Sequence, residues 1–308
     1  MTVPPPGLHG GDGPVVAEAL GLDPSSVLDL SVSLNPFAPD VRSLALGHLD
    51  ALTRYPDPEC ATRALAGVIG VDASRVVLTN GGSEAIAMVA AELGPGWVDE
   101  PDFSLYRRHL PAVVAGAPRW RSNPRNPTGR LAVPDETAAV WDEAFYPLAT
   151  GAWTRGDADA VVVGSLTKVF ACPGLRLGYV LAPDAGLAER LRRRQPRWAV
   201  NGIAAALVPE LLERTDLPAW SRGIAVLRTQ LVDVLQAHGL RPRPSDAPFV
   251  VVDRAAGLRD RLAPLGIVVR DCTSFGLAGC ARIAVPGPDG LERLDRALDA
   301  VAAEEVSA

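Results

Sequence analysis

The chain has 308 residues, enough for one large domain with an appendage or for two domains. Hydrophobic residues make up 48% and charged residues 21%, which excludes disorder over most of its length. A net charge of −6 argues against nucleic acid as a partner, and no apolar run is long enough to predict a membrane span.

Local patterns predict alternating helices and strands. Residues 1–14 are rich in Gly and Pro and predict an irregular arm, and residues 94–142 are predicted to hold little regular structure. In chain order, the other predictions are a strand at 27–33, a helix at 58–69, a strand at 75–78, a helix at 84–93, strands at 159–164 and 175–181, a helix at 183–194, helices over 200–238 with a break near Pro218, a strand at 248–252, a helix at 254–265, strands at 267–270 and 281–285, and a helix at 289–304. This alternation indicates an α/β fold with a mostly parallel main sheet.

The same patterns suggest a division into domains. We expect a large domain over 41–205 and a small C-terminal domain over 206–308, with an N-terminal arm, 1–40, joining the small one. Within the large domain, a strand, the Gly-rich turn Thr79–Ser83 and a helix follow one another. This unit places the amides of a helix N-terminus beside an anion.

The basic residues are divided very unevenly between arginine and lysine. Of the 30 basic residues, 29 are Arg and one is Lys168. A GC-rich genome explains why lysine is scarce, but not why one lysine is retained. Arginine stays protonated, whereas lysine can lose its proton and attack a carbonyl group. The count therefore points to amine chemistry at Lys168.

The cysteines and the N-terminus favour a cytoplasmic protein. Residues 1–10 lack the basic and apolar regions of a signal peptide. The four cysteines contain no CxxC pair, so neither a metal site nor a disulfide is expected.

The residues around Lys168 suit a phosphorylated aldehyde cofactor. A predicted strand leads into Ser165-Leu166-Thr167-Lys168, and a GLRLG segment with Arg176 follows. The Ser165 hydroxyl and the Arg176 guanidinium suit a phosphate dianion, while the lysine amine would attack the aldehyde. The alternative is a lone lysine in a surface loop, which the GLRLG segment argues against.

At this point the sequence resembles a known family. Residues 165–179, SLTKVFACPGLRLGY, resemble the lysine segment of the fold-type-I, pyridoxal-phosphate-dependent aminotransferases of class I/II. NPRNPTG at 123–129 and DEAF at 142–145 match two further segments of the family in the same order. The resemblance covers about residues 9–300. It implies a large domain with a mostly parallel sheet flanked by helices, a smaller α/β C-terminal domain and a homodimer, but with a middle region, 109–142, shorter than the family norm.

The resemblance also implies roles for individual residues. Lys168 would form a Schiff base with pyridoxal 5′-phosphate and shuttle a proton, and Asp142 would pair with the pyridine nitrogen and keep the ring protonated. The other implied cofactor contacts are Asn126 at the phenolic oxygen, Phe103 stacked on the ring, Gly82, Ser83, Ser165 and Arg176 at the phosphate, and Tyr55 at the phosphate of the partner subunit.

The N-terminal part is similar to one group within the family. His9-Gly10-Gly11-Asp12 and the segment 28–37, which contains Asn35, resemble the opening of the threonine-phosphate decarboxylases of cobalamin biosynthesis. The substrate would then be a small phosphorylated amino acid, with Arg282 at its carboxylate and Arg270 and His9 at its phosphate. Asn35 belongs to the same set of substrate residues.

Three activities remain open from the sequence. The first is decarboxylation of L-threonine O-phosphate or a similar phosphorylated amino acid, which makes the protein a pyridoxal-phosphate-dependent lyase. The second is transamination of histidinol phosphate or a related amine. The third is binding of pyridoxal phosphate without turnover. The pathway, whether cobalamin, histidine or natural-product synthesis, is also open.

Overall fold

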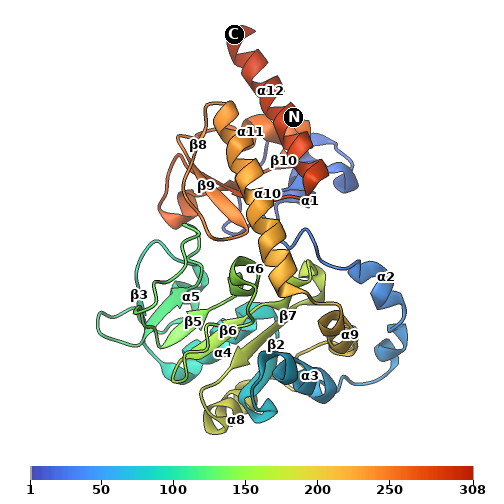
Figure 1. The fold of residues 1–308 in the computed structure, drawn as a ribbon, viewed down its shortest axis with the longest axis vertical. Helices are drawn as coiled ribbons and strands as arrows, with labels where there is room; N and C mark the ends of the chain where they lie inside the picture. The colour runs from blue at the N-terminus through green and yellow to red at the C-terminus, as the bar shows by residue number, and fades with distance from the viewer. Residues whose placement is uncertain (1, 308) are drawn as a thin grey trace. The chain divides into compact units, whose positions relative to one another are not determined.

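The computed structural model describes residues 2–307, which divide into two compact units (Figure 1). The large unit comprises Phe37–Asn126 and Leu131–Ser221. The small unit comprises the described residues up to Pro36, the short segment Pro127–Arg130, and the described residues from Arg222 onward. The boundary after Ser221 falls inside a long helix, α10 (Leu217–Ala237).

The large unit is built on a six-stranded sheet. Its strands, in spatial order, are β2 (Val76–Asn80), β7 (Leu177–Leu181), β6 (Val161–Gly164), β5 (Val140–Asp142), β4 (Arg119–Ser122) and β3 (Trp97–Val98). The strands from β3 to β6 are mutually parallel, and β7 is antiparallel to both β2 and β6. The expectation of a mostly parallel main sheet is confirmed. The Val-rich β6 is buried along its whole length, as its apolar run predicts.

Besides this sheet, the large unit contains a set of helices. They are α2 (Val41–Leu46), α3 (Glu59–Ile69), α4 (Gly81–Leu93), α5 (Leu105–His109), α6 (Tyr146–Thr150), α7 (Leu166–Val169), α8 (Ala185–Arg194) and α9 (Gly202–Glu213). The Ala-rich α4 packs against β7, α5 and α8, and α3 packs against α9. Small side chains let α4 lie close to the sheet, which sets the position of the α4 N-terminus beside the ends of the strands.

The small unit contains two sheets. Strand β1 (Leu28–Asp29) pairs in parallel with β10 (Ile267–Val268). An antiparallel sheet has the order β11 (Arg270–Asp271), β12 (Ala281–Ala284), β9 (Phe249–Asp253) and β8 (Arg241–Pro242). Its helices are α1 (Gly13–Leu20), α10, α11 (Leu258–Leu262) and α12 (Pro288–Ser307). Apolar residues of α10, α11, α12 and these strands form one buried core. This arrangement confirms the smaller α/β part of the expected fold.

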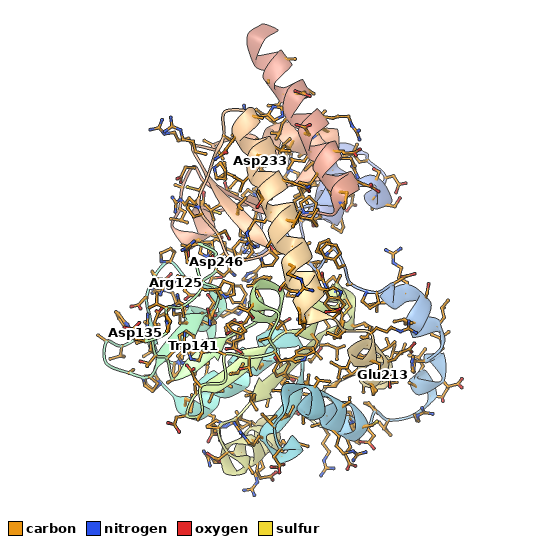
Figure 2. All side chains as sticks on the ribbon, in the orientation of Figure 1. Arg125, Asp135, Trp141, Glu213, Asp233 and Asp246 are labelled. Atoms are coloured by element: carbon orange, nitrogen blue, oxygen red, sulfur yellow. The ribbon has the colours of Figure 1, made fainter. Side chains whose placement is uncertain are left out.

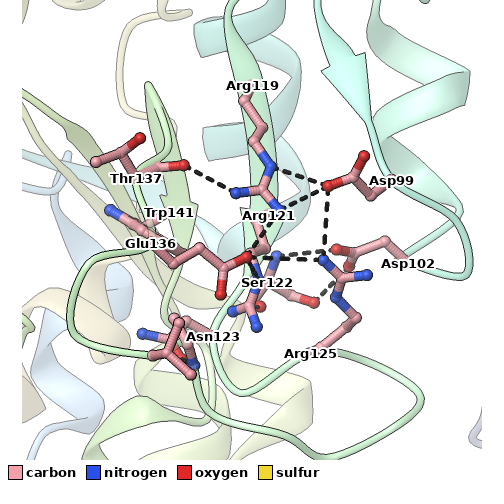
Figure 3. Close-up of polar contacts among 12 residues, drawn as sticks. Asp99, Asp102, Arg119, Arg121, Ser122, Asn123, Arg125, Glu136, Thr137 and Trp141 are labelled. Carbon is pink, nitrogen blue, oxygen red and sulfur yellow. Dashed lines mark hydrogen bonds and ion pairs between the residues drawn. The ribbon is translucent and has the colours of Figure 1, made fainter.

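Regular structure over residues 94–142 is sparse, as expected, but β3, α5, β4 and β5 lie within the region, and the three strands belong to the main sheet. These elements are only two to five residues long, and β4 carries two charged residues, Arg119 and Arg121. Both arginines lie 2.7 Å from Glu136 Oε1 (Figure 3). The neutralised charges can therefore sit in a buried strand that the sequence pattern does not reveal.

The short connection before β5 is held by side chain to backbone hydrogen bonds. Arg155 donates to the carbonyl oxygens of Val133, Pro134 and Glu136 at 3.1, 2.7 and 2.8 Å. The Arg155 guanidinium also lies over the Trp141 ring, 4.9 Å from its centroid. This anchoring accounts for an ordered segment in the shortened middle region. In the part of the chain that the structure describes, no helix has the length and apolar character needed to cross a membrane.

Candidate active site

Lys168 lies in a short helix that directly follows a buried strand. Strand β6 ends at Gly164, Ser165 follows in an extended conformation, and Lys168 lies within α7. The lysine is half-buried, and its Nζ is 6.0 Å from the centroid of the Phe145 ring. Its charge also acts on the Asp142 carboxyl. The sequence-predicted lysine and aspartate are therefore brought together in the large unit.

Asp142 is a buried carboxylate with two hydrogen-bond donors. It ends β5, where its Oδ2 accepts from the Tyr106 hydroxyl at 2.8 Å and its Oδ1 accepts from the Ala144 N–H at 3.0 Å. Burial raises the pKa of Asp142, and the Tyr106 hydroxyl, the Ala144 amide and the Lys168 charge oppose that rise. Burial has the larger effect, so the pKa of Asp142 is raised overall, while the donors and the nearby cation act toward the ionised form.

The N-terminus of α4 lies close to Arg176. A Cβ atom on Gly81, whose φ is +77°, would come within 2.5 Å of an Arg176 guanidinium nitrogen. A Cβ on Gly82 would lie 3.8 Å from the Ser165 Cβ, so the loop before Lys168 adjoins the same helix end. Ser83, the next residue of α4, is exposed. Glycine at 81 therefore allows a guanidinium, helix amides and two hydroxyls to share one corner of the large unit.

Arg176 itself has an unusual backbone. Its φ of +55° lies in the left-handed region, and Ala171 in the same segment has a φ of +49°. Residues with a Cβ avoid this region, and such strain is concentrated at functional sites. The Arg176 side chain is exposed and donates to the Pro173 carbonyl at 3.3 Å. The conformation orients a cation toward the α4 N-terminus.

Phe103 lies on the loop before α5, and Asn126 lies on the loop after β4. Phe103 is half-buried and meets Tyr106 edge-on, with ring centroids 5.8 Å apart. Asn126 is buried, and its N–H donates to Ser122 Oγ at 2.7 Å. Ser122 ends β4 in register with Asp142 of β5. The loop carrying Asn126 is therefore tied to the strand neighbouring that of Asp142.

Tyr55 lies exposed at the surface of the large unit. It stacks on Trp198 with ring centroids 4.4 Å apart, and the two side chains are 75% and 55% exposed. Three more exposed apolar side chains precede it in the sequence, Leu46, Leu49 and Leu52. Exposed apolar side chains of this kind are often covered by another protein when they lie together.

The predicted substrate arginines are neighbours in the small unit. Arg270 of β11 is directly opposite Arg282 of β12 in the strand register, and both are buried. Arg282 donates to the Ser31 carbonyl at 3.1 Å and lies 4.8 Å over the centroid of Phe249. Burial lowers the pKa of Arg282 to about 10, so it remains cationic at neutral pH.

Arg270 is joined to the N-terminal arm. It donates to the Gly7 carbonyl at 2.6 Å, to the Leu8 carbonyl and to the Ser274 hydroxyl. These bonds bring the segment with His9, which is exposed, to the arginine pair. Asn35 is also in the small unit and is buried. Of the predicted substrate residues, Arg270, Arg282 and the His9 segment are thus brought together.

Sequence reasoning missed three residues of the large unit, namely Tyr106, Ser122 and Asp102. Tyr106 is fully buried against Asp142, and Ser122 and Asp102 share a hydrogen bond (Figure 3). A weak signal existed, because Tyr106 follows Phe103 by three residues, a spacing that puts two side chains on one helical face. Nothing in the sequence indicates that Asp102 would be buried.

Glu143, next to Asp142, is a buried carboxyl whose titration should appear in stability. Burial raises its pKa to about 7, and the Arg155 N–H donates to its Oε1 at 3.0 Å. Between the unfolded pKa and pH 7 the folded protein binds the extra proton, so unfolding free energy falls as pH rises. Glu143→Gln removes this pH dependence. Within that window, the free energy of unfolding of the variant should therefore rise relative to the wild type by about 1.4 kcal/mol for each pH unit.

Urea denaturation at several pH values between 5 and 8 measures this difference. The control is Glu213→Gln, the same exchange at an exposed position of α9 (Figure 2). Parallel wild-type and Glu143→Gln curves across the range would contradict the assignment.

The fold and the Lys168 site define a pyridoxal-phosphate enzyme of the aminotransferase type. The family model described as aminotransferase class I and II matches residues 120–301. The chain belongs to this family, and membership confirms the pyridoxal 5′-phosphate expected from the sequence. The family resemblance stated from the sequence is likewise confirmed.

Individual relatives carry two different names. The chain is 32% identical to threonine-phosphate decarboxylase of Salmonella typhimurium, over 94% of this chain and 95% of the relative. It is 30% identical to histidinol-phosphate aminotransferase 2 of Pseudomonas aeruginosa, over 94% of this chain and 93% of the relative. Both alignments, at 349 and 348 positions, are longer than the chain itself, so the relatives contain segments without a counterpart here.

A solved structure agrees with the fold. Histidinol-phosphate aminotransferase of Sinorhizobium meliloti, in complex with pyridoxal-5′-phosphate, superimposes with a TM-score of 0.80 at 20% identity, with 94% of each chain covered. The fold-type-I expectation is therefore confirmed.

Proposed function

We propose that the corner formed by the α4 N-terminus, Ser165 and Arg176 holds the phosphate of pyridoxal 5′-phosphate. The support is chemical, since helix amides, hydroxyls and a guanidinium are all donors to a dianion. Gly82 and Ser83 contribute the first turn of α4. The close approach that Gly81 permits to Arg176 fits an anion shared between them.

The ring of the cofactor would lie between Phe103, Asn126 and Asp142. When bound, pyridoxal phosphate supplies an electron-withdrawing ring that accepts the electron pair of a bond broken at the substrate Cα. Asp142 would retain a proton on the ring nitrogen in its ionised form, toward which Tyr106 and Lys168 act against the larger effect of burial. Lys168 would attach the cofactor through its Nζ and, once released, hold the proton that is delivered to Cα.

The substrate that best fits the arginine pair carries two anionic groups. Arg270 and Arg282 lie directly opposite each other in the strand register. Their guanidinium groups would therefore bind two anionic groups of the same small molecule. Arg282 would take the carboxylate, and Arg270 with His9 would take a phosphomonoester, with Asn35 as a further polar contact. L-threonine O-phosphate carries both groups, whereas histidinol phosphate has no carboxylate.

Decarboxylation of such a phosphorylated amino acid is therefore the proposed activity. The bond between Cα and the carboxylate breaks, carbon dioxide leaves, and a proton is added at Cα to give an aminoalkyl phosphate. Transamination of histidinol phosphate is the second candidate, because a relative at 30% identity has that name. Binding without turnover is the third, and rests only on the shortened middle region.

A single assay separates the three activities. The pyridoxal-phosphate-loaded protein is incubated with L-threonine O-phosphate and no 2-oxo acid, and carbon dioxide and aminopropanol phosphate are measured. We expect both products in equal amounts. A parallel reaction contains histidinol phosphate and 2-oxoglutarate. Glutamate formed there, with no carbon dioxide in the first reaction, would favour the aminotransferase, and no product in either would favour binding alone.

We also propose a homodimer that covers the apolar surface around Tyr55. The support is the exposed stack of Tyr55 on Trp198, together with the exposed Leu46, Leu49 and Leu52 earlier in the same unit. In a dimer Tyr55 would reach the cofactor phosphate of the partner subunit. Sedimentation analysis of the wild type and of Leu52→Glu measures the state, and a wild-type monomer would contradict it.

A further inference from the structure

We propose that Asp102, Ser122 and Tyr106 form a buried positioning unit behind the three side chains expected to surround the cofactor ring, Phe103, Asn126 and Asp142. The inference rests on the proposed function for the identity of those three side chains. It assigns a role to Asp102 and Ser122, which the proposed chemistry does not use, and joins them to Tyr106, the donor to Asp142.

Asp102 is the hydrogen-bond acceptor that connects the positioning unit to the surrounding backbone. It is 2% exposed, and its carboxylate accepts three hydrogen bonds. The Phe103 N–H donates at 2.7 Å and the Ser122 N–H at 3.2 Å, and the Ser122 hydroxyl makes a short bond to Oδ1 (Figure 3). One carboxylate thus fixes both the backbone that carries Phe103 and the end of strand β4.

Ser122 connects Asp102 to the backbone of Asn126 by hydrogen bonds. Its Oγ donates to Asp102 and at the same time accepts from the Asn126 N–H at 2.7 Å. A hydroxyl that donates and accepts in this way has its orientation fixed, because its proton is committed to the carboxylate. The position of the Asn126 backbone therefore depends on Asp102 through a single intermediate group.

Tyr106 completes the positioning unit on the side of Asp142. Its ring is fully buried between Phe103 and Trp120, and its hydroxyl donates to Asp142 Oδ2 at 2.8 Å. Burial raises the pKa of Tyr106 most, the charges of Asp142 and Asp102 raise it further, and the Ser122 side chain acts in the opposite sense. The phenol therefore remains protonated and serves as a permanent donor to Asp142.

A purely structural role would predict different behaviour. Buried polar groups are expensive when unpaired, so the loss of any member should lower stability in either case. Only a positioning role makes the affinity for the cofactor and the pH response of the bound cofactor depend on these residues. Both quantities are measured by binding and spectroscopy without turnover.

The first test compares two tyrosine variants. Tyr106→Phe removes the hydroxyl that donates to Asp142. Tyr179→Phe removes an equally buried hydroxyl that is also close enough to Asp142 to be affected by its charge, but has no hydrogen-bond partner among the described residues. Pyridoxal phosphate is titrated into each apoprotein, and the visible absorbance of the bound cofactor is followed against pH.

We expect Tyr106→Phe to bind pyridoxal phosphate roughly tenfold more weakly, the size of one hydrogen bond to a charged group. The absorbance transition that depends on Asp142 should move about one unit or more to higher pH, because a donor that lowered the pKa of Asp142 is lost. Ala144 and Lys168, the other groups acting on Asp142, are unchanged in this variant. Tyr179→Phe should match the wild type in both measurements.

The second test addresses Asp102. Asp102→Asn keeps the size of the side chain but loses one acceptor oxygen. Its control is Asp157→Asn, at a carboxylate that accepts from Trp141 Nε1 at 2.7 Å and from Arg155 Nε at 3.0 Å. Both variants should be less stable in urea. Only Asp102→Asn should bind pyridoxal phosphate roughly tenfold more weakly and alter the circular dichroism of the bound cofactor.

The outcomes separate the two proposals. If the wild type binds no pyridoxal phosphate, the proposed function and the positioning unit both fail. If the wild type binds it, and Tyr106→Phe and Asp102→Asn match their controls in affinity and spectrum, the positioning unit is overturned while the proposed function stands.

Discussion

Replacing Lys168 with alanine should lower turnover by roughly 10⁴-fold or more, the largest single effect expected in this protein. In the proposed mechanism this amine would both attach the cofactor and carry the proton to Cα, and no other group would perform either step. Lys168→Arg is the sharper variant. It keeps a cation near Asp142 but cannot attack an aldehyde, because its guanidinium stays protonated. Steady-state rates of carbon dioxide release from L-threonine O-phosphate measure both variants.

Chemical trapping provides a second readout of the same prediction. Borohydride reduction should fix pyridoxal phosphate to one peptide, which mass spectrometry assigns. Lys168 is the only lysine of the chain, so a modified lysine has one possible position. Rates near the wild type in Lys168→Arg, or cofactor retained after borohydride treatment of Lys168→Ala, would exclude Lys168 as the attachment point.

Replacing Asp142 with asparagine should lower turnover by roughly 10²- to 10³-fold, comparable to the loss of one preorganised electrostatic group. The amide cannot carry the negative charge that retains a proton on the ring nitrogen. The Tyr106 hydroxyl can still donate to the amide oxygen, so the fold around β5 should survive.

Rates of carbon dioxide release and the absorbance spectrum of the bound cofactor measure this loss. Asp142→Glu keeps the charge and should recover part of the rate, which separates charge from packing. Asp157→Asn controls for the removal of a carboxylate from a neighbouring polar network. Equal rates for Asp142→Asn and Asp142→Glu would show that charge at this position is unimportant.

Local sequence signals predicted the lysine strand and the Gly-rich helix start well. Strand β6 is a run of valines and was expected at 159–164, and it spans Val161–Gly164. Helix α4 begins three residues earlier than the predicted Glu84, because Gly81 and Gly82 enter the first turn. Both features depend on patterns within about ten residues, which a single sequence contains.

The middle region could not be predicted in this way. Arg119 and Arg121 alternate with Trp120 and Ser122 in β4, a pattern that gives no apolar strand signal. The strand is stabilised by Asp99 and Glu136, which come from other parts of the chain. Burial of Tyr106 against Asp142 likewise depends on a contact across 36 positions. Pairings of this kind are made by the tertiary fold and leave no local trace.

Position 176 sets stability and activity against each other. Arg176 has a left-handed backbone conformation, which costs a residue with a Cβ about 1–2 kcal/mol of folding free energy. A glycine at this position would avoid that cost. A glycine there would remove the guanidinium that lies beside Gly81 at the proposed phosphate corner. Selection for a more heat-resistant protein would therefore favour a change that selection for cofactor retention forbids. If Arg176 holds the cofactor phosphate as proposed, Arg176→Gly should therefore raise stability while it weakens cofactor binding.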